Sequence, residues 1–544
     1  MRFLKLKRKI AVILASTLAM TTVLTGCSSS NDGQTSGKDV FELNVCVGPE
    51  PETIDPQKNT ASDGSTLINH TFEGLMKLDS ENNIVGGQAE KHEVSEDGTV
   101  YTFTLREDAK WSDGQPVKAS DFVYAWQRLV NPETASDYNY MIDMVLNANE
   151  IMEGKKDVSE LGIKAIDDKT LEITLKTPTA YFLEICAFPA TYPVRADIVD
   201  ANPDTWSTSP ETYIGNGPYV LKEWNHQANM VYTQNENYYD VENLGPDKIN
   251  FQLMEDDNTI LSAFKNEEIL FGDSLPNDEI AAMTDNGLEI KSQLGTYFLC
   301  FNVNKEGLDN AKVRQALSLA IDRQYLVDKV AQGGQIPADT FVPTGLSDVD
   351  NSKEFHDVAE AWYSIDDNAA NVEKAKELLK EAGYENGQGL PSIELMCNPG
   401  HEAIMEAVQS MWKELGVNVT ISSQDWNVFL VTRKDGDYQV ARHGWLGDYN
   451  DPISFLDMWV TGGGNNDAQW SNAEYDKLIS EIKSSTNQEE RYQKMHEAEN
   501  ILAEEMPVVP LYYYTDLMLV SEKLEGFYSS PLGYKFFMYT SVTE

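Results

Sequence analysis

The chain has 544 residues and a formal net charge of −46, with 41% hydrophobic and 24% charged residues. This length exceeds what one hydrophobic core needs, so two or three domains are expected. So acidic a chain argues against binding to nucleic acid and against direct docking on anionic lipid, and favours solubility.

The N-terminal segment has the layout of a secretory signal. An apolar run, residues 10–24, follows five basic side chains and is too short to span a membrane comfortably. The basic side chains are Arg2, Lys5, Lys7, Arg8 and Lys9. Because residues 1–26 carry no acidic side chain, their removal changes the formal net charge from −46 to −51. No second stretch is long and apolar enough to cross a membrane.

The signal ends in Leu24-Thr25-Gly26-Cys27, which resembles the lipobox of bacterial lipoproteins. The resemblance implies cleavage before Cys27 and attachment of a diacylglycerol to its sulfur, with palmitate among the fatty chains. Two or three such chains anchor a protein stably to a membrane. The alternative is an ordinary signal peptide with an incidental cysteine. Residues 27–39, rich in Ser, Asn and Gly, predict a flexible tether.

The remaining cysteines and the histidines give no sign of a metal site or a cofactor. Cys46, Cys186, Cys300 and Cys397 are scattered without C-x-x-C spacing, so a disulfide and buried thiols both remain open. The seven histidines include no pair at i, i+3 or i+4, which argues against zinc.

Strand and helix patterns alternate along the chain. Residues 100–105 alternate as a strand does, and residues 171–175 predict another strand. Ser120 is expected to cap a helix with one apolar face. That face consists of Phe122, Ala125, Trp126 and Leu129. A later helix has an apolar face of Val313, Ala316, Leu317, Ala320 and Ile321.

The clearest unit predicts parallel strands. Residues 393–396 and 417–421 are apolar and strand-like, and residues 403–415 between them have helical periodicity that stops at Gly416. A strand, a helix and a strand at this spacing form a right-handed βαβ unit. Residues 438–441 predict a further strand. The class is therefore α/β, with ligands expected beyond the carboxyl ends of the parallel strands.

Six sequence motifs in order resemble the family-five solute-binding proteins, the peptide-binding subunits of ABC importers. The longest is T-F-T-L-R-E-D-A-K-W-S-D-G-Q-P-V-K-A-S-D-F-V-Y-A-W, which ends at Trp126. The others are D-P-Q-K at Asp55, F-E-G-L at Phe72, G-N-G-P-Y at Gly215, V-R-Q-A-L at Val313 and A-R-H-G-W-L-G-D-Y-N-D-P at Ala441. The resemblance covers essentially the whole mature chain and is greatest to the oligopeptide-binding branch.

The resemblance implies a periplasmic-binding-protein-like fold of three domains in two lobes, which close on a ligand about a two-strand hinge. Carried onto this sequence, residues 1–26 are the signal peptide and residues 27–39 the tether. Domain I combines residues 40–72, 198–298 and 513–544. Domain II, residues 73–197, extends the first lobe, and domain III, residues 299–512, is the second lobe.

The resemblance also implies a peptide site. Asp448 corresponds to the family aspartate that binds the ligand's free amino group, as a buried carboxylate facing an ammonium would. Its alternative is an Asx turn before Pro452. Gly444, Trp445 and Leu446 correspond to the segment that pairs main chain to main chain with an extended peptide. Trp426 and Tyr138, with Trp445, would line side-chain pockets, or they would pack in the core.

The ligand's carboxyl end is expected to meet His401, Arg433 or Arg442, depending on peptide length. His401 opens the predicted helix, where a carboxylate is favoured by free N–H groups. The alternative for Arg433 is an exposed surface charge. One departure from the family pattern is Thr60, which replaces a glutamate that often pairs with the arginine here numbered Arg442. Preferred peptide length therefore stays open.

The expected function is capture of oligopeptides and delivery to an ABC permease, by a monomer anchored to the outer face of the bacterial membrane. An enzyme is not expected, because the chain contains no G-x-S-x-G or H-E-x-x-H, and Gly462-Gly463-Gly464 lacks the residues of a P-loop. Alternatives are a pheromone or wall-peptide receptor, or a family member binding nickel, haem or an oligosaccharide.

Overall fold

The computed structural model describes residues 40–350, 352–485 and 487–543, and from Phe41 onward these residues belong to one compact unit. None of the helices in these ranges has the length and apolar character that a membrane crossing requires. Cys27 and residues 1–39 as a whole, with the predicted signal and tether, lie outside the described residues.

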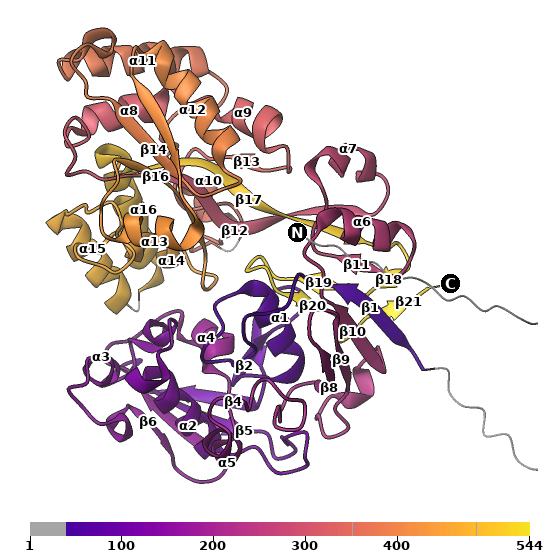
Figure 1. Ribbon diagram of the computed structural model, residues 1–544. Helices are drawn as coiled ribbons and strands as arrows, with labels where there is room; N and C mark the ends of the chain where they lie inside the picture. The colour runs from indigo at the N-terminus through magenta and orange to yellow at the C-terminus, as the bar shows by residue number, and fades with distance from the viewer. Residues whose placement is uncertain (1–39, 351, 486, 544) are drawn as a thin grey trace, which may run out of the picture. The chain divides into compact units, whose positions relative to one another are not determined.

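A mixed sheet of eleven strands is the largest element (Figure 1). Its order is β15-β14-β16-β12-β17-β11-β1-β10-β9-β8, and β13 also pairs with β17. The strands are β15 (Val419–Ser423), β14 (Ile393–Cys397), β16 (Val440–Leu446), β12 (Leu288–Phe301), β17 (Val508–Val520), β11 (Phe271–Gly272), β1 (Glu42–Cys46), β10 (Lys248–Gln252), β9 (Asn229–Gln234), β8 (Tyr219–Asn225) and β13 (Ile336–Pro337).

Two long strands join the two halves of this sheet. β12 and β17 run antiparallel, with pairs from Leu288↔Leu519 to Cys300↔Val508 (Figure 1). Their register shifts between Ser292 and Thr296, so the ladder is interrupted there. Strands β14 to β16 lie on one side of the pair, and β11, β1 and β10 on the other. A β-bulge or an interrupted ladder bends the strands that contain it. The interruption in β12 and β17 lies where the chain passes from one half of the sheet to the other.

The predicted βαβ unit is confirmed. β14 and β15 are parallel, from Ile393↔Val419 to Cys397↔Ser423, and α12 (Glu402–Glu414) connects them. Gly416 follows with a φ of +80°, a conformation that glycine adopts without strain. Helices α8 (Ala311–Leu319) and α11 (Asn368–Glu381) contribute to the same core through Val313, Leu317 and Leu379.

A second, antiparallel sheet carries the longest of the six motifs. Its order is β4-β5-β7-β6, formed by β4 (Ala89–Val94), β5 (Val100–Leu105), β7 (Thr170–Thr174) and β6 (Ile163–Ala165). The apolar face of α2 (Ala119–Val130) is fully buried, as its periodicity predicts. Other helices near the site are α1 (Ser62–Thr71), α13 (Trp426–Lys434), α15 (Ala473–Ser484) and α16 (Gln488–Glu505).

One local expectation was wrong, and a predicted strand is present with other bounds. The helix at α2 is not capped by Ser120, because it begins at Ala119 and the Asp121 carboxylate accepts the Lys118 N–H at 3.0 Å. Ser120 is an exposed residue of the first turn. The strand expected at 438–441 instead runs from Val440 to Leu446, because β12 pairs with it as far as Gly295↔Leu446.

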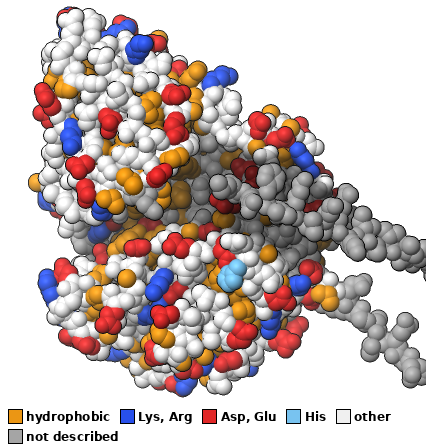
Figure 2. All heavy atoms as spheres, in the orientation of Figure 1, with side chains coloured by type: hydrophobic (Ala, Val, Ile, Leu, Met, Phe, Trp, Pro, Cys, Tyr) orange, Lys and Arg blue, Asp and Glu red, His pale blue; other side chains and the backbone are white. Residues whose placement is uncertain are grey.

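The charge is spread over the surface. Asp and Glu side chains are scattered over the face shown in Figure 2 and do not gather in one patch there. Cys46, Cys186, Cys300 and Cys397 are all free and buried, so of the two alternatives for these cysteines the structure has the buried thiols.

Candidate ligand-binding site

Asp448 is a carboxylate that lines a cavity and forms no ion pair with any described residue. It follows β16, and its N–H donates to Ser454 Oγ at 3.0 Å. Its Oδ2 accepts the Tyr140 hydroxyl at 2.9 Å. Burial raises the pKa of Asp448 to about 7, although the hydrogen bond from Tyr140 opposes this and the nearby charge of Asp457 adds to it. Within the described ranges Asp448 forms no ion pair, so a ligand ammonium would stabilise it.

The cavity beside Asp448 has a volume of about 500 Å³. Tyr181 and Tyr449 line it as a stacked pair, with ring centroids 4.7 Å apart. Asp457 also lines it, but Lys483 pairs with that carboxylate at 2.9 Å. Asp457 is thus already neutralised, and Asp448 is the better acceptor for a cation from a ligand.

Trp445 stands between this cavity and a second one of about 470 Å³, since it lines both. Its Nε1 donates to the Ser454 carbonyl at 2.7 Å, which fixes the indole. The second cavity is also lined by Trp426, which begins α13 and is 48% exposed. Two large aromatic surfaces are therefore open to a ligand that extends away from Asp448.

One edge of β16 is available for main-chain pairing. β12 pairs with β16 along its whole length, from Phe301↔Val440 to Gly295↔Leu446. β14 pairs on the other edge only at Val440 and Ala441. Among the described residues, no strand covers that edge from Arg442 to Leu446. An extended chain laid there would complete the ladder by strand addition.

Gly444 is required by close packing. A Cβ at this position would collide with the Tyr514 hydroxyl of β17. Tyr514 belongs to the strand that pairs with β12, so the bare backbone at Gly444 lets this ring lie against β16.

The three predicted cations belong to two separate groups, Arg433 in one and Arg442 with His401 in the other. Arg433, at the end of α13, is 9% exposed, and its Nε donates to Asp467 Oδ2 at 2.7 Å. Although burial opposes it, His443 and the Arg433 charge lower the pKa of Asp467. Arg433 lines the second cavity but is already paired, and it is not the exposed surface charge of the alternative.

Arg442 and His401 form a separate cluster. The Arg442 guanidinium lies 5.2 Å from the centroid of the Tyr297 ring, and the Tyr297 hydroxyl is 3.2 Å from His401 Nδ1. Burial and the Arg442 charge lower the pKa of His401 to about 4, so this imidazole is neutral at pH 7. Arg442 Nε is buried without a hydrogen-bond partner among the described residues. Thr60 is exposed, and no described carboxylate forms an ion pair with Arg442.

Tyr138 packs near the Asp448 carboxylate without lining either cavity. Its ring lies 5.0 Å from that of Phe188 and 5.9 Å from that of Tyr140. Burial and the Asp448 charge raise the pKa of Tyr138. In the described part of the chain, no cluster of three or more His, Cys, Asp or Glu side chains is arranged to hold a metal ion.

A family model, the middle region of the bacterial extracellular solute-binding proteins of family 5, matches residues 83–467. The chain belongs to this family. It is 35% identical over 540 residues to the oligopeptide-binding protein OppA of Bacillus subtilis strain 168, covering 96% of this chain and 98% of the relative.

Solved structures of family 5 proteins share the fold. Haemophilus influenzae OppA in complex with the peptide RPPGFSPFR matches with a TM-score of 0.78 and 30% identity, covering 93% of this chain and all of that one. The pheromone receptor PrgZ matches with a TM-score of 0.78 and 28% identity over the same shares. The expected α/β, periplasmic-binding-protein-like fold with several domains is thereby confirmed, and these relatives are binding proteins.

Several residues of this candidate site were not predicted from the sequence. Tyr140 meets Asp448 across 308 residues of chain, Lys483 neutralises Asp457, and Asp467 neutralises Arg433. No local pattern marks these partners, because each contact joins segments far apart in the sequence.

Proposed function

We propose that this protein captures oligopeptides outside the cytoplasmic membrane and delivers them to an ABC permease. The observation that carries the proposal is that, among the described residues, the Asp448 carboxylate has no ion-pair partner and the nearby edge of β16 has no neighbouring strand beyond Ala441. A peptide would satisfy both, because its free amino group would pair with Asp448 and its extended main chain would pair with β16. The relatives support it, since one is an oligopeptide-binding protein and another binds a peptide in its solved complex.

The peptide's amino group pairs with Asp448, and its main chain pairs with Gly444, Trp445 and Leu446. Its side chains lie against Trp445 and Trp426, whereas Tyr138, which lines neither cavity, packs behind Tyr140. Its carboxylate meets Arg442 and His401, or Arg433 in a peptide of another length. Arg442 is the better partner, because no described residue forms a hydrogen bond with its Nε, whereas Arg433 is held by Asp467.

Binding is accompanied by closure of two lobes. Domains I and II, residues 40–72, 73–197, 198–298 and 513–544, form one lobe, and residues 299–512 form the other. β12 and β17 connect them, and the interrupted register at Ser292 to Thr296 is the place where bending costs least. Closure would bring Trp426, 48% exposed in this structure, against the ligand.

Peptide length should matter more than peptide sequence. Two charged ends are held by fixed groups, whereas side chains meet hydrated cavities that tolerate many shapes. Calorimetry with unmodified peptides of two to eight residues and randomised centres should show affinity that varies more with length than with composition. The peptides should be recovered intact, and cleavage would instead indicate an enzyme.

A dedicated signal receptor is the second candidate, because the chain matches the pheromone receptor PrgZ as well as it matches OppA of Haemophilus influenzae. The same peptide panel separates the two functions. A receptor would bind one sequence and reject scrambled peptides of equal length, whereas an importer would bind both.

The membrane anchor rests on Cys27, and Cys27→Ser should remove it. Without the thiol no diacylglycerol can be attached, so the protein should appear as soluble material or as unprocessed precursor. Cell fractionation with labelled palmitate measures this, and Ser29→Ala is the matched control that should stay anchored. A Cys27→Ser protein that is processed and membrane-bound like the parent would refute the anchor.

A further inference from the structure

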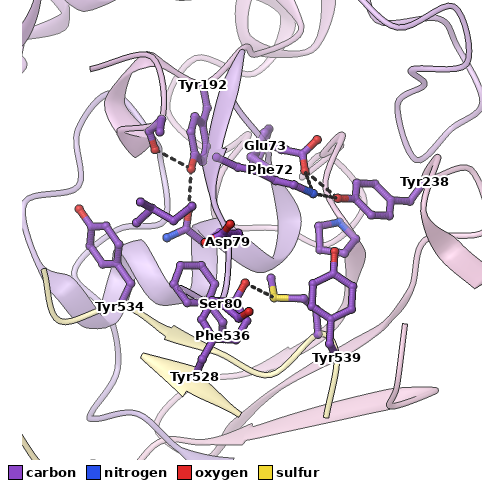
Figure 3. A pocket seen from close by; sticks show the side chains of 16 residues that line it. Phe72, Glu73, Asp79, Ser80, Tyr192, Tyr238, Tyr528, Tyr534, Phe536 and Tyr539 are labelled. Atoms are coloured by element: carbon purple, nitrogen blue, oxygen red, sulfur yellow. Dashed lines mark hydrogen bonds and ion pairs between the residues drawn. The ribbon is translucent and has the colours of Figure 1, made fainter. Parts of the chain in front are cut away.

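A third cavity borders the site described above, because Tyr534 in its wall lies near Tyr138 and Asp448. It has a volume of about 220 Å³ and is enclosed by α1, β2 (Met76–Leu78) and the C-terminal segment that contains β19 (Tyr528–Ser529) and β20 (Lys535–Phe536) (Figure 3). None of the residues that line it lines either cavity beside Trp445. A molecule bound there would be a second ligand and not a part of the first.

The walls of this cavity are mostly aromatic rings. Figure 3 shows Phe72, Tyr192, Tyr238, Tyr528, Tyr534 and Phe536 around it. Tyr528 and Phe536 stack with ring centroids 4.6 Å apart and planes 15° from parallel. An apolar cavity of about 150 Å³ holds one benzene molecule in a protein interior. The space here therefore suits one aromatic ring with small substituents.

Asn69 of α1 supplies a polar group in the lining that lacks a partner. Its side chain is 8% exposed, and its Nδ2 has no hydrogen-bond partner among the described residues. The Tyr192 hydroxyl lies 2.7 Å from Asn69 Oδ1 and 2.9 Å from the Ala187 carbonyl oxygen. A hydroxyl has one hydrogen to donate, and a carbonyl oxygen can only accept. If the Asn69 amide is flipped so that its Nδ2 donates to the Tyr192 hydroxyl, that hydroxyl donates to the Ala187 carbonyl oxygen.

Either orientation of the amide leaves one Asn69 atom unpaired. The unpaired atom is the Nδ2 donor in one case and the Oδ1 acceptor in the other. A ligand hydroxyl satisfies both, since it can accept and donate. Leaving a buried polar group without a hydrogen bond is unfavourable, so a ring with a hydroxyl would be selected over a bare ring.

The charged groups of this cavity do not suit an anion. The Lys77 ammonium is fully engaged by Glu73 at 3.0 Å and by the hydroxyls of Tyr239 and Tyr238 at 2.9 and 3.2 Å. Asp79 lies beside exposed Ser80 in the turn after β2, and both line the cavity. Although partial burial opposes it, hydrogen bonds from Asn83 and Glu81 lower the pKa of Asp79, so this carboxylate is ionised at neutral pH.

We propose that this cavity binds a small, neutral or cationic aromatic compound that carries a hydroxyl group, independently of the ligand at Asp448. The ring lies between the tyrosine and phenylalanine walls, and the hydroxyl bonds to Asn69. Asp79 repels carboxylates at the entrance and attracts an amine.

Calorimetry on the full chain tests this proposal. Trialanine is added first to saturate the peptide site, and phenol, tyramine, 4-hydroxyphenylacetate and benzene are then titrated separately. Phenol and tyramine should each bind at one site, benzene about tenfold more weakly than phenol, and 4-hydroxyphenylacetate about tenfold more weakly than tyramine. The Asp448→Asn protein should give the same result, so the test holds even if the peptide site is assigned wrongly. An absence of phenol binding, or equal binding of all four, would overturn the proposal.

Two variants locate the binding. Ser80→Trp places a large ring at the entrance and should abolish phenol binding, whereas Ser120→Trp, at an exposed position of α2, should leave it unchanged. Asn69→Leu should bind phenol and benzene equally while keeping a ring-sized cavity. Equal phenol binding by the two tryptophan variants, or a retained preference for phenol in Asn69→Leu, would show that the rings bind elsewhere.

Discussion

Asp448→Asn should weaken the binding of an unmodified peptide by about 2–4 kcal/mol, the loss expected when one partner of a desolvated charge pair is removed. The carboxylate faces a cavity, accepts one hydrogen bond from Tyr140 and forms no ion pair with any described residue. The amide keeps the size of the side chain and removes only its charge. Calorimetry with trialanine measures the difference.

Two controls make this result specific. N-acetyltrialanine lacks the ammonium, so it should bind the parent protein weakly and the variant no worse. Asp137→Asn changes an exposed carboxylate of the same cavity and should cost about 0.5 kcal/mol or less. If the parent protein binds trialanine and its acetylated form equally, Asp448 does not hold the amino group.

The affinity for trialanine amide should fall about fiftyfold between pH 7 and pH 5, because about half of the free carboxyl is ionised at pH 7 and about one part in a hundred at pH 5. The pKa of Asp448 in the free protein is about 7, against a usual 3.8. A bound ammonium requires the ionised form, so binding in acid must release a proton. Because folding raises this pKa, Asp448 contributes to the stability of the ligand-free fold in acid, where it is protonated. This contribution to stability is lost as the pH rises toward 7.

The pH dependence due to Asp448 can be separated from the pH dependence due to the groups that meet the peptide's carboxyl end. The pKa of His401 is about 4 in the free protein, so a peptide carboxylate beside it would favour proton uptake and oppose the trend in acid. Trialanine amide, which lacks the carboxylate, should show the full dependence. The Asp448→Asn protein should bind it with nearly constant affinity from pH 5 to pH 8. An equally steep profile in that variant would assign the titration to another group.

The sequence by itself determined the family, the βαβ unit and the motif that contains Asp448. Each depends on residues close together in the chain, where helical or strand periodicity and a run of matching residues carry the information. The buried face of α2 and the parallel pairing of β14 with β15 follow from such local patterns.

The tertiary structure alone decided which groups are free to bind. Side chains alternate across a strand, so the register of β16 against β12 puts Arg442 toward Tyr297 and places Trp445 beside the cavities. Asp467 neutralises Arg433 and Tyr140 reaches Asp448 through contacts between distant segments. The aromatic cavity at Asn69 likewise joins residues from both ends of the chain. Such contacts depend on how the elements pack, and no spacing in the sequence specifies that packing.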